Sequence, residues 1–408
     1  MRRAAALSLL SVLSLLSLVP SRAAARDIDE EGIAHAVREL ERVRGEKLGE
    51  PPPIQRLRRE DFRDLVSGQI DTALGGAEQI ERLQNVLRGL DLLDREDTLL
   101  GLAMRFLPAS VGAQYDPYEK RIRVLGNVRG STSLLVHELT HALDDRRFDL
   151  RAKIRAGELD FDRLLALGAL AEGSAESVQR SYDTNGGVQL VPLALIREQG
   201  EKRIEQYLAA RRQFPRFLAR SFIFQYFGGF LFVQTEMRRR GEGWTRLDEI
   251  FRDPPQTTEQ VLHPEKYRAK EGPKPVREIA PDGWRETGRN RLGELGTAIV
   301  IEAWRPALGW RYAARAAQGW GGDRIVTYER DGRRAMIWRT VWDDDGAAYR
   351  FAHAMRIAAL RGDRIEAGGV VVAERDDGYD LLAHRGREVT VARDVPRDSL
   401  RAFVLAIR

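Results

Sequence analysis

The spacing of apolar residues divides the chain into helical and strand-rich stretches. Within residues 27–50, apolar side chains recur at helical intervals, at Ile33, Val37, Leu40 and Val43, and a run of three prolines then ends the pattern. Further helices are predicted at about residues 59–75, 77–90 and 95–106. None of these stretches carries recognisable chemistry. We therefore expect residues 26–108 to form an N-terminal helical region.

The next stretch has a different pattern. Residues 111–115 and 121–125 alternate with a period of two around Asp116-Pro117, which is typical of a β-hairpin. A loop then leads into a predicted helix, and three residues are candidates for its N-cap, namely Ser131, Thr132 and Ser133.

Helical spacing continues up to about residue 270. We expect further helices at about residues 164–177, 192–212 and 215–240. The last of these contains a strongly apolar stretch at residues 222–233. Arg220, Gln225 and a pair of glycines interrupt that stretch, so a buried core helix is a better interpretation than a membrane span.

The remainder of the chain follows a predicted Gly-Pro-Lys-Pro linker at residues 272–275. Alternating patterns predict strands at 324–329, 334–341, 368–372, 379–384 and 388–392, and helices are expected at about 292–303, 344–359 and 397–407. Residues 276–408 should thus form a small C-terminal α+β domain, for which the sequence indicates no chemistry. We expect an α+β protein that is mainly helical before this domain.

The clearest chemical signal is the motif His-Glu-x-x-His at residues 137–141. Residues four apart lie on one face of a helix, so His137 and His141 can bind one ion, with Glu138 beside them. Imidazole nitrogen suits zinc, and a catalytic zinc keeps three protein ligands and one water. A neighbouring carboxylate such as Glu138 can take the proton of that water. The alternative is a chance match in an exposed helix.

A carboxylate that can complete the ligand set lies in the next predicted helix. That helix is apolar until Glu172, and a carboxylate at the end of such a run is costly to bury unless it binds a cation. Gly173 and Ala175 are small enough to let another helix approach. Glu176 lies one turn further on the same face and can accept a proton from the far nitrogen of a ligand histidine. A solvated helix face is the alternative for both glutamates, and Glu176 as third ligand stays open.

This arrangement resembles the thermolysin-like (gluzincin) zinc metallopeptidases, in which a glutamate on a second helix follows the His-Glu-x-x-His motif. The resemblance covers about residues 110–270. It implies that His137, His141 and Glu172 bind zinc and that Glu138 is the general base. A zinc metallopeptidase core is accordingly expected over residues 109–270.

The resemblance has two further implications. It places the acid at Glu176 where the family has a supporting carboxylate. It also places the predicted hairpin beside the cleft, where a free edge can pair with an extended peptide, although a purely structural hairpin is the alternative. Thermolysin has Asn before its ligand glutamate, whereas Ala171 stands here, so a divergent branch is indicated.

Two residues are candidates for stabilising the oxyanion of the reaction, as a His or Tyr beside the metal does in zinc peptidases. Tyr226 lies in the apolar helix, where a core position is the alternative. His263 lies at the end of a short predicted helix, between a Thr cap and Pro264, and the alternative for it is a local turn. Gly228-Gly229 should let the apolar helix pack against the motif helix.

Residues 1–25 resemble a secretory signal, with Arg2 and Arg3, an apolar stretch and a terminal Ala-Ala-Ala. The alternative is a retained anchor. Without the three arginines of this segment, the formal charge falls from +5 to +2, which does not indicate nucleic-acid binding. The chain has no Cys, so core burial alone must stabilise it.

The favoured function is zinc-dependent hydrolysis of a peptide or protein substrate in the periplasm or outside the cell, without a stable membrane span after signal removal. One alternative is a non-catalytic binding or assembly protein of the cell envelope that zinc stabilises. The other is a metal-free scaffold in which the motif is accidental.

Overall fold

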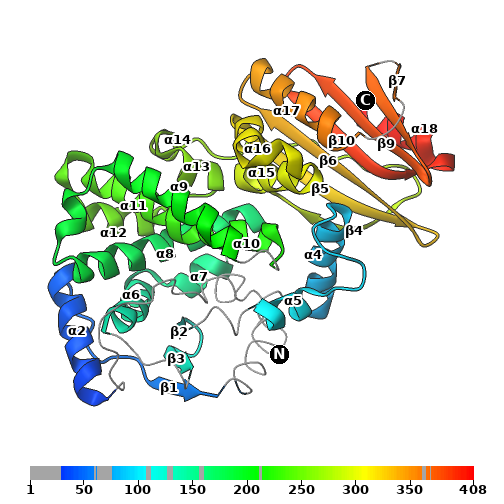
Figure 1. Ribbon diagram of the computed structural model, residues 1–408. Coiled ribbons are helices and arrows are strands. Elements are labelled where there is room, and N and C mark those ends of the chain that lie inside the picture. The colour runs from blue at the N-terminus through cyan, green and yellow to red at the C-terminus, as the bar shows by residue number, and fades with distance from the viewer. Residues whose placement is uncertain are drawn as a thin grey trace.

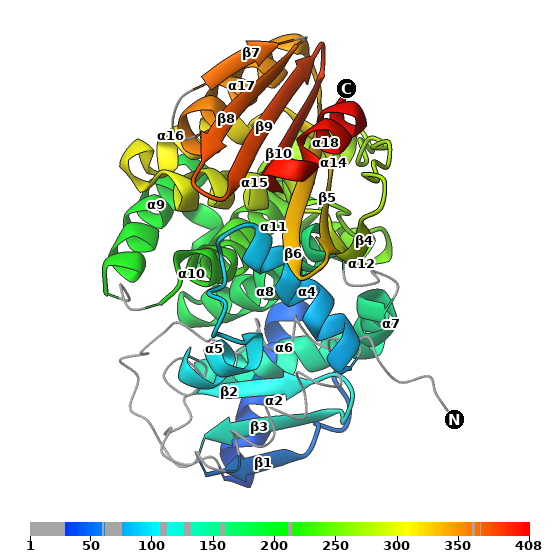
Figure 2. The same ribbon diagram turned by 90° about the vertical axis from the view of Figure 1, so that its right-hand side faces the viewer.

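The protein is described here by a computed structural model covering residues 29–58, 61, 76–106, 112–125, 132–155, 160–210, 214–360, 364–367 and 369–408. A helical part, with a small sheet at one end, packs against a large antiparallel sheet with its own helices (Figures 1 and 2). The fold is thus α+β, as predicted. The expected signal at 1–25 and, apart from Asp61, the helix expected at 59–75 lie outside the described residues.

The helical part contains twelve described α-helices. They are α2 (Glu30–Arg44), α4 (Ala77–Gly89), α5 (Leu99–Phe106), α6 (Thr132–Phe148), α7 (Leu150–Arg155), α8 (Phe161–Asp183), α9 (Leu193–Ala210), α10 (Arg216–Ile223), α11 (Gly229–Arg238), α12 (Gly243–Arg252), α13 (Thr258–Leu262) and α14 (Pro264–Arg268). Short turns η2 (Gly187–Leu190), η3 (Phe224–Gly228) and η4 (Arg239–Gly241) connect some of them. Helix α2 ends just after Val43, the last of its apolar positions, and before the prolines that were expected to end it, because Gly45 adopts a left-handed conformation that closes the helix.

The small sheet has the strand order β1 (Ile54–Leu57), β3 (Arg121–Leu125), β2 (Ala113–Asp116). The predicted hairpin is confirmed, since β2 and β3 pair antiparallel, with Tyr115 opposite Ile122. Strand β1 pairs parallel with β3 and was not predicted, because four residues are too few to show an alternating pattern. Strand β2 remains at an edge, next to α6 (Figure 2).

Helices α10 and α11 form one continuous rod, as expected for residues 215–240, but a π-helical turn, η3, lies between them. A π turn inserts an extra residue and changes the direction of the side chains around it, and such turns are frequent at functional sites. Tyr226 lies within η3.

The C-terminal part is a seven-stranded sheet in which every neighbouring pair is antiparallel. In spatial order the strands are β4 (Arg285–Asn290), β5 (Trp320–Arg330), β6 (Arg333–Trp342), β10 (Glu388–Pro396), β9 (Gly378–Arg385), β8 (Val370–Arg375) and β7 (Arg364–Ala367). Helices α15 (Gly293–Trp304), α16 (Gly309–Ala317) and α17 (Asp345–Ala358) share a core with one face, and α18 (Leu400–Ile407) packs on the other. Short turns η5 (Pro306–Leu308) and η6 (Arg397–Ser399) complete this part.

Five strands and three helices of the C-terminal part were predicted at nearly their observed positions. Strands β4 and β7 and helix α16 were missed. The sequence of β4, Arg-Glu-Thr-Gly-Arg-Asn, is almost entirely polar, so periodicity cannot reveal it.

The two parts share an interior. Leu295 and Ile299 of α15 belong to the same hydrophobic core as Leu165 and Ala169 of α8. Helix α4, from the N-terminal region, packs on the outer strands of the large sheet, where Gly89 approaches Thr327. The C-terminal part therefore packs directly against the helical part and shares a hydrophobic core with it.

The predicted linker is also part of this packed structure. The backbone N–H of Lys274 donates to the carbonyl of Gly321 over 2.7 Å, and a side chain at Gly322 would collide with the Lys274 backbone. The segment thus connects α14 to the C-terminal part, as a linker does, and its backbone packs against β5. No helix in the described ranges combines the length and apolar character that a membrane-spanning segment requires.

Candidate metal centre

The motif helix α6 is buried on all sides. Every residue from Leu135 to Asp145 is buried, because α2, α8 and β2 surround the helix. The polar side chains of the motif therefore lie in the interior, which excludes the alternative of an exposed helix.

Helix α8 crosses α6 and brings Glu172 to the two histidines. The side chain of Asp160 caps its first turn. Further along, Gly173 lies so close to α11 that an added Cβ would stand 2.3 Å from the carbonyl oxygen of Gly229. Gly229 in turn faces the Ala169 carbonyl. The expectation that the glycine pair packs against α6 was therefore wrong, because Gly229 lies against the Glu172 helix instead.

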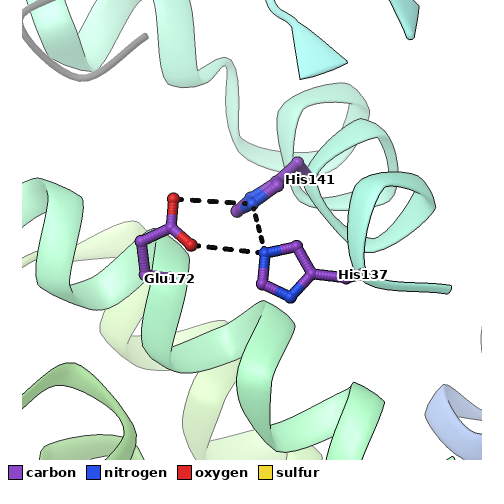
Figure 3. Close-up of side chains that lie close together, drawn as sticks. All are labelled: His137, His141 and Glu172. Carbon is purple, nitrogen blue, oxygen red and sulfur yellow. Dashed lines mark hydrogen bonds and ion pairs between the residues drawn. The ribbon is translucent and has the colours of Figure 1, made fainter. Parts of the chain in front are cut away.

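His137, His141 and Glu172 point at one another (Figure 3). The two Nε2 atoms are 3.2 Å apart. Glu172 Oε2 lies 3.3 Å from Nε2 of His137, and Oε1 lies 3.7 Å from Nε2 of His141. Ligands at zinc bond lengths of about 2.0–2.2 Å in a tetrahedron are separated by about 3.4 Å. Each carboxylate oxygen thus faces one imidazole nitrogen at a separation close to that value, and one ligand atom from each residue lies within 4.8 Å of the other two.

In the described part of the chain, Glu172 lacks the hydrogen-bond donors that a buried carboxylate normally has. Its side chain is fully buried, and neither carboxylate oxygen receives a hydrogen bond of normal geometry from a described residue. A buried charge without hydrogen bonds or a cation costs several kcal/mol, so such groups are normally paired or bound to a metal. Two imidazoles and one carboxylate thus form a donor set that fits a divalent cation such as zinc.

The protonation states of the metal-free cluster follow from this burial. Burial opposes the protonation of His137, but the Glu172 carboxylate outweighs it and raises the pKa of His137 to about 9. Burial and the neighbouring His137 lower the pKa of His141 well below its usual range. Burial raises the pKa of Glu172, and contact with His137 partly offsets that effect. A bound cation would replace the proton that holds this cluster together.

Glu138 is held beside the cluster by the edge of the small sheet. Its Oε2 accepts the backbone N–H of Tyr115 over 2.7 Å. Burial raises the pKa of Glu138 to about 7, against the lowering effects of His137 and of this hydrogen bond. A base performs best when its pKa is near the working pH, so this position suits proton transfer at neutral pH.

The residue that supports His137 is not the predicted one. Nδ1 of His137 faces Oε1 of Gln179 at 3.0 Å. Glu176 instead accepts a hydrogen bond from Nε of Arg180 over 2.7 Å. The prediction that Glu176 supports a ligand histidine was therefore wrong for His137. Gln179 lies seven residues after Glu172, two turns along the same helix face, and this spacing is the only signal that the sequence offered.

Tyr226 lies next to the cluster, as one interpretation of the sequence allowed. Its ring stacks on His137 with a centroid separation of 6.2 Å, and contact with its hydroxyl lowers the pKa of Glu172. The residue is buried. Tyr226 thus reaches the cluster from the π-helical turn of the α10–α11 rod.

His263 lies elsewhere. Its Nε2 is 2.9 Å from Glu294 of α15, and its Nδ1 is near Glu265. Thr257 caps α13, as predicted, and Thr258 binds Asp162, which lies about 15 Å along α8 from Glu172 at 1.5 Å per residue. His263 thus joins α13 to the C-terminal part, and the structure does not bring it to the histidine–glutamate cluster.

Fold and site together define an α+β protein with a buried cluster of two histidines and one glutamate. Residues 278–403 match a family described as a domain of unknown function (DUF8575). This match covers β4 to β10 and helices α15 to α17 but none of the cluster residues. Comparison with curated proteins and with solved structures finds no match.

Proposed function

We propose that this protein is a zinc-dependent peptidase in which His137, His141 and Glu172 hold the metal. The observation that carries the proposal is the convergence of two imidazole nitrogens on a buried carboxylate that accepts no hydrogen bond of normal geometry from the described residues. The set of two imidazoles and one carboxylate is a known ligand set of catalytic zinc, which keeps a fourth position for water or substrate.

Zinc bound there would polarise the scissile carbonyl and make a water molecule acidic. Glu138 takes one proton from the attacking water as the water oxygen bonds to the carbonyl carbon. It then gives that proton to the amine as the C–N bond breaks, so Glu138 ends in its starting state. Tyr226 lies next to His137 and Glu172, and its hydroxyl can donate a hydrogen bond to the oxyanion.

The edge of strand β2 suggests where a substrate would bind. The N–H of Tyr115 points away from β3 toward Glu138. Because residues of an antiparallel strand alternate in direction, the polar backbone groups of Ala113 lie on the same outer edge. An extended peptide that pairs with this edge would pass Glu138. The proposed substrate is therefore an extended peptide, and the segment at 1–25 supports a location outside the cytoplasm.

One observation favours a second function. All four residues of β2 are buried, and His141, the most accessible of the three proposed ligands, has a side chain that is only 9% exposed. A closed site of this kind also suits a zinc ion that stabilises the fold of a binding or assembly protein without catalysis.

Metal analysis and hydrolysis of unfolded casein separate these functions. We expect about one zinc per chain and hydrolysis that a chelator stops. Glu138→Gln should keep the zinc and lower the rate at least about 100-fold, since it removes the base. Glu198→Gln, which changes an exposed carboxylate on α9, is the control and should leave the rate unchanged. Zinc without hydrolysis would favour the stabilising role, and absence of zinc would exclude both.

A further inference from the structure

We propose that Gln179 is a positioning residue for the metal centre, and that it acts as the middle of a relay that runs from Asp183 through Ser133 to His137. The relay fixes which nitrogen of His137 carries a proton and leaves Nε2 free to bind a metal. This inference rests on the proposed function, because it concerns the ligand geometry of the same zinc site.

The relay is a chain of three hydrogen bonds between the end of α8 and the start of α6. Gln179 Nε2 lies 2.9 Å from Oγ of Ser133, and that oxygen lies 3.1 Å from Oδ2 of Asp183. At the other end, Oε1 of Gln179 lies 3.0 Å from Nδ1 of His137. Gln179 and Ser133 are buried, while Asp183 is exposed.

The direction of each bond follows from the donors available. An exposed aspartate is ionised at neutral pH and only accepts hydrogen bonds. Ser133 has one hydroxyl proton and donates it to Asp183, so its oxygen must accept from the Gln179 amide. The amide oxygen then faces His137, and only a protonated Nδ1 can donate to it. A charge at the surface thereby sets the tautomer of a buried imidazole.

The Glu176 carboxylate, one turn before Gln179, does not orient His137. Glu176 forms a 2.7 Å ion pair with Arg180, so its negative charge is already balanced. The partner of the ligand His137 is thus a neutral amide. A partner of this kind orients the ring and the tautomer without adding charge next to the metal.

The test is zinc affinity, measured by competition with a chromophoric chelator. Gln179→Leu removes the acceptor and should weaken zinc binding about 10- to 100-fold, as loss of such partners usually does. Gln179→Glu keeps an acceptor of the same size and should restore the affinity to within a few-fold of wild type. Ser133→Ala removes the acceptor of the Gln179 amide and should weaken zinc binding by an intermediate amount. This variant replaces Gln179→Leu in the test if that protein does not fold.

Two control variants separate positioning from packing. Gln234 is a second buried glutamine, on α11, and it binds Ser177 of α8 without contacting His137. Gln234→Leu should lower stability but leave zinc affinity within about twofold, and an equal loss in Gln234→Leu and Gln179→Leu would overturn the relay. Glu176→Gln should also leave the affinity within a few-fold, and a large loss there would make Glu176 the supporting residue instead.

Nitrogen NMR of the zinc-loaded protein reads out the tautomer of His137 directly. A protonated Nδ1 is expected. A protonated Nε2 would overturn the inference. If wild-type protein binds no zinc, the proposed function itself fails. If wild type binds zinc and the Gln179 variants bind it equally well, only the relay fails.

Discussion

Two buried carboxylates, one in each part of the molecule, have opposite surroundings. Asp323, in β5, accepts hydrogen bonds from the indoles of Trp320 and Trp338 and from two backbone N–H groups at the start of α15. Glu172, in α8, is equally buried, but it accepts no hydrogen bond of normal geometry from the residues that the structure describes and faces two imidazoles instead.

On the proposed function, the difference separates a structural acid from a metal ligand. Four donors surround Asp323 and partly offset the burial that raises its pKa to about 6, and these hydrogen bonds anchor α15 to the sheet. Glu172 has its charge left available for a ligand. Burial alone therefore does not indicate a candidate ligand, whereas a buried carboxylate with neither oxygen hydrogen-bonded favours one.

The largest expected effect is that of zinc on stability. A ligand that binds only the folded state at a thousandfold excess over its Kd adds about 4 kcal/mol to the free energy of unfolding. Thermal unfolding with added zinc or with a chelator should show this in wild type and not in Glu172→Gln. A zinc effect of equal size in both proteins would place the metal elsewhere.

The next prediction compares the two acids directly in metal-free protein. Asp323→Asn should lower the free energy of unfolding by about 3 kcal/mol, because it removes charge-assisted hydrogen bonds and turns an amide toward N–H donors. Glu172→Gln should cost less, about 1 kcal/mol, because it removes the pairing with His137 but also the cost of burying the carboxylate charge. Urea unfolding measures both, and similar losses would make Glu172 a structural acid as well.

A smaller effect is expected from the contact that places Glu172. Gly229→Ala would put a Cβ 1.9 Å from the carbonyl oxygen of Ala169, so α8 and α11 must separate. We expect a loss of about 2 kcal/mol, typical of overpacking, together with weaker zinc binding. Gly187→Ala meets only ordinary contacts and is the control. Unchanged zinc affinity in a destabilised Gly229→Ala protein would show that the ligand position tolerates helix movement.

The smallest effect is expected at His263. Its hydrogen bond with Glu294 raises the pKa of His263, against the effect of burial. A raised pKa means that the folded state holds the proton more tightly. The stabilisation is therefore complete below the usual value of about 6.5 and is lost as the pH rises through the raised value.

His263→Gln should accordingly cost about 1 kcal/mol at pH 6 and less at higher pH, as urea unfolding at several pH values can show. Peptide hydrolysis should be unchanged after correction for the folded fraction. A 100-fold or larger fall in rate would instead assign His263 the oxyanion role.

Much of the fold was accessible from periodicity. Helices with a clear apolar face, such as α4 and α17, and alternating strands, such as β6 and β10, were predicted close to their observed bounds. Strand β4 and the packed segment around Lys274 were not predicted, because their structure depends on neighbours distant in sequence. Propensity and pattern describe a segment by itself, and tertiary contacts can override them.

The sequence by itself determined which side chains can form a site. The four-residue spacing puts His137 and His141 on one helix face, and the apolar run before Glu172 indicates that this acid is buried. Only the tertiary structure decided which partners these groups have. In the folded protein, the hydrogen-bond partner of His137 is Gln179, that of Glu176 is Arg180, and that of His263 is Glu294. Helical spacing fixes positions within one helix, whereas the packing of separate helices fixes the partners across them.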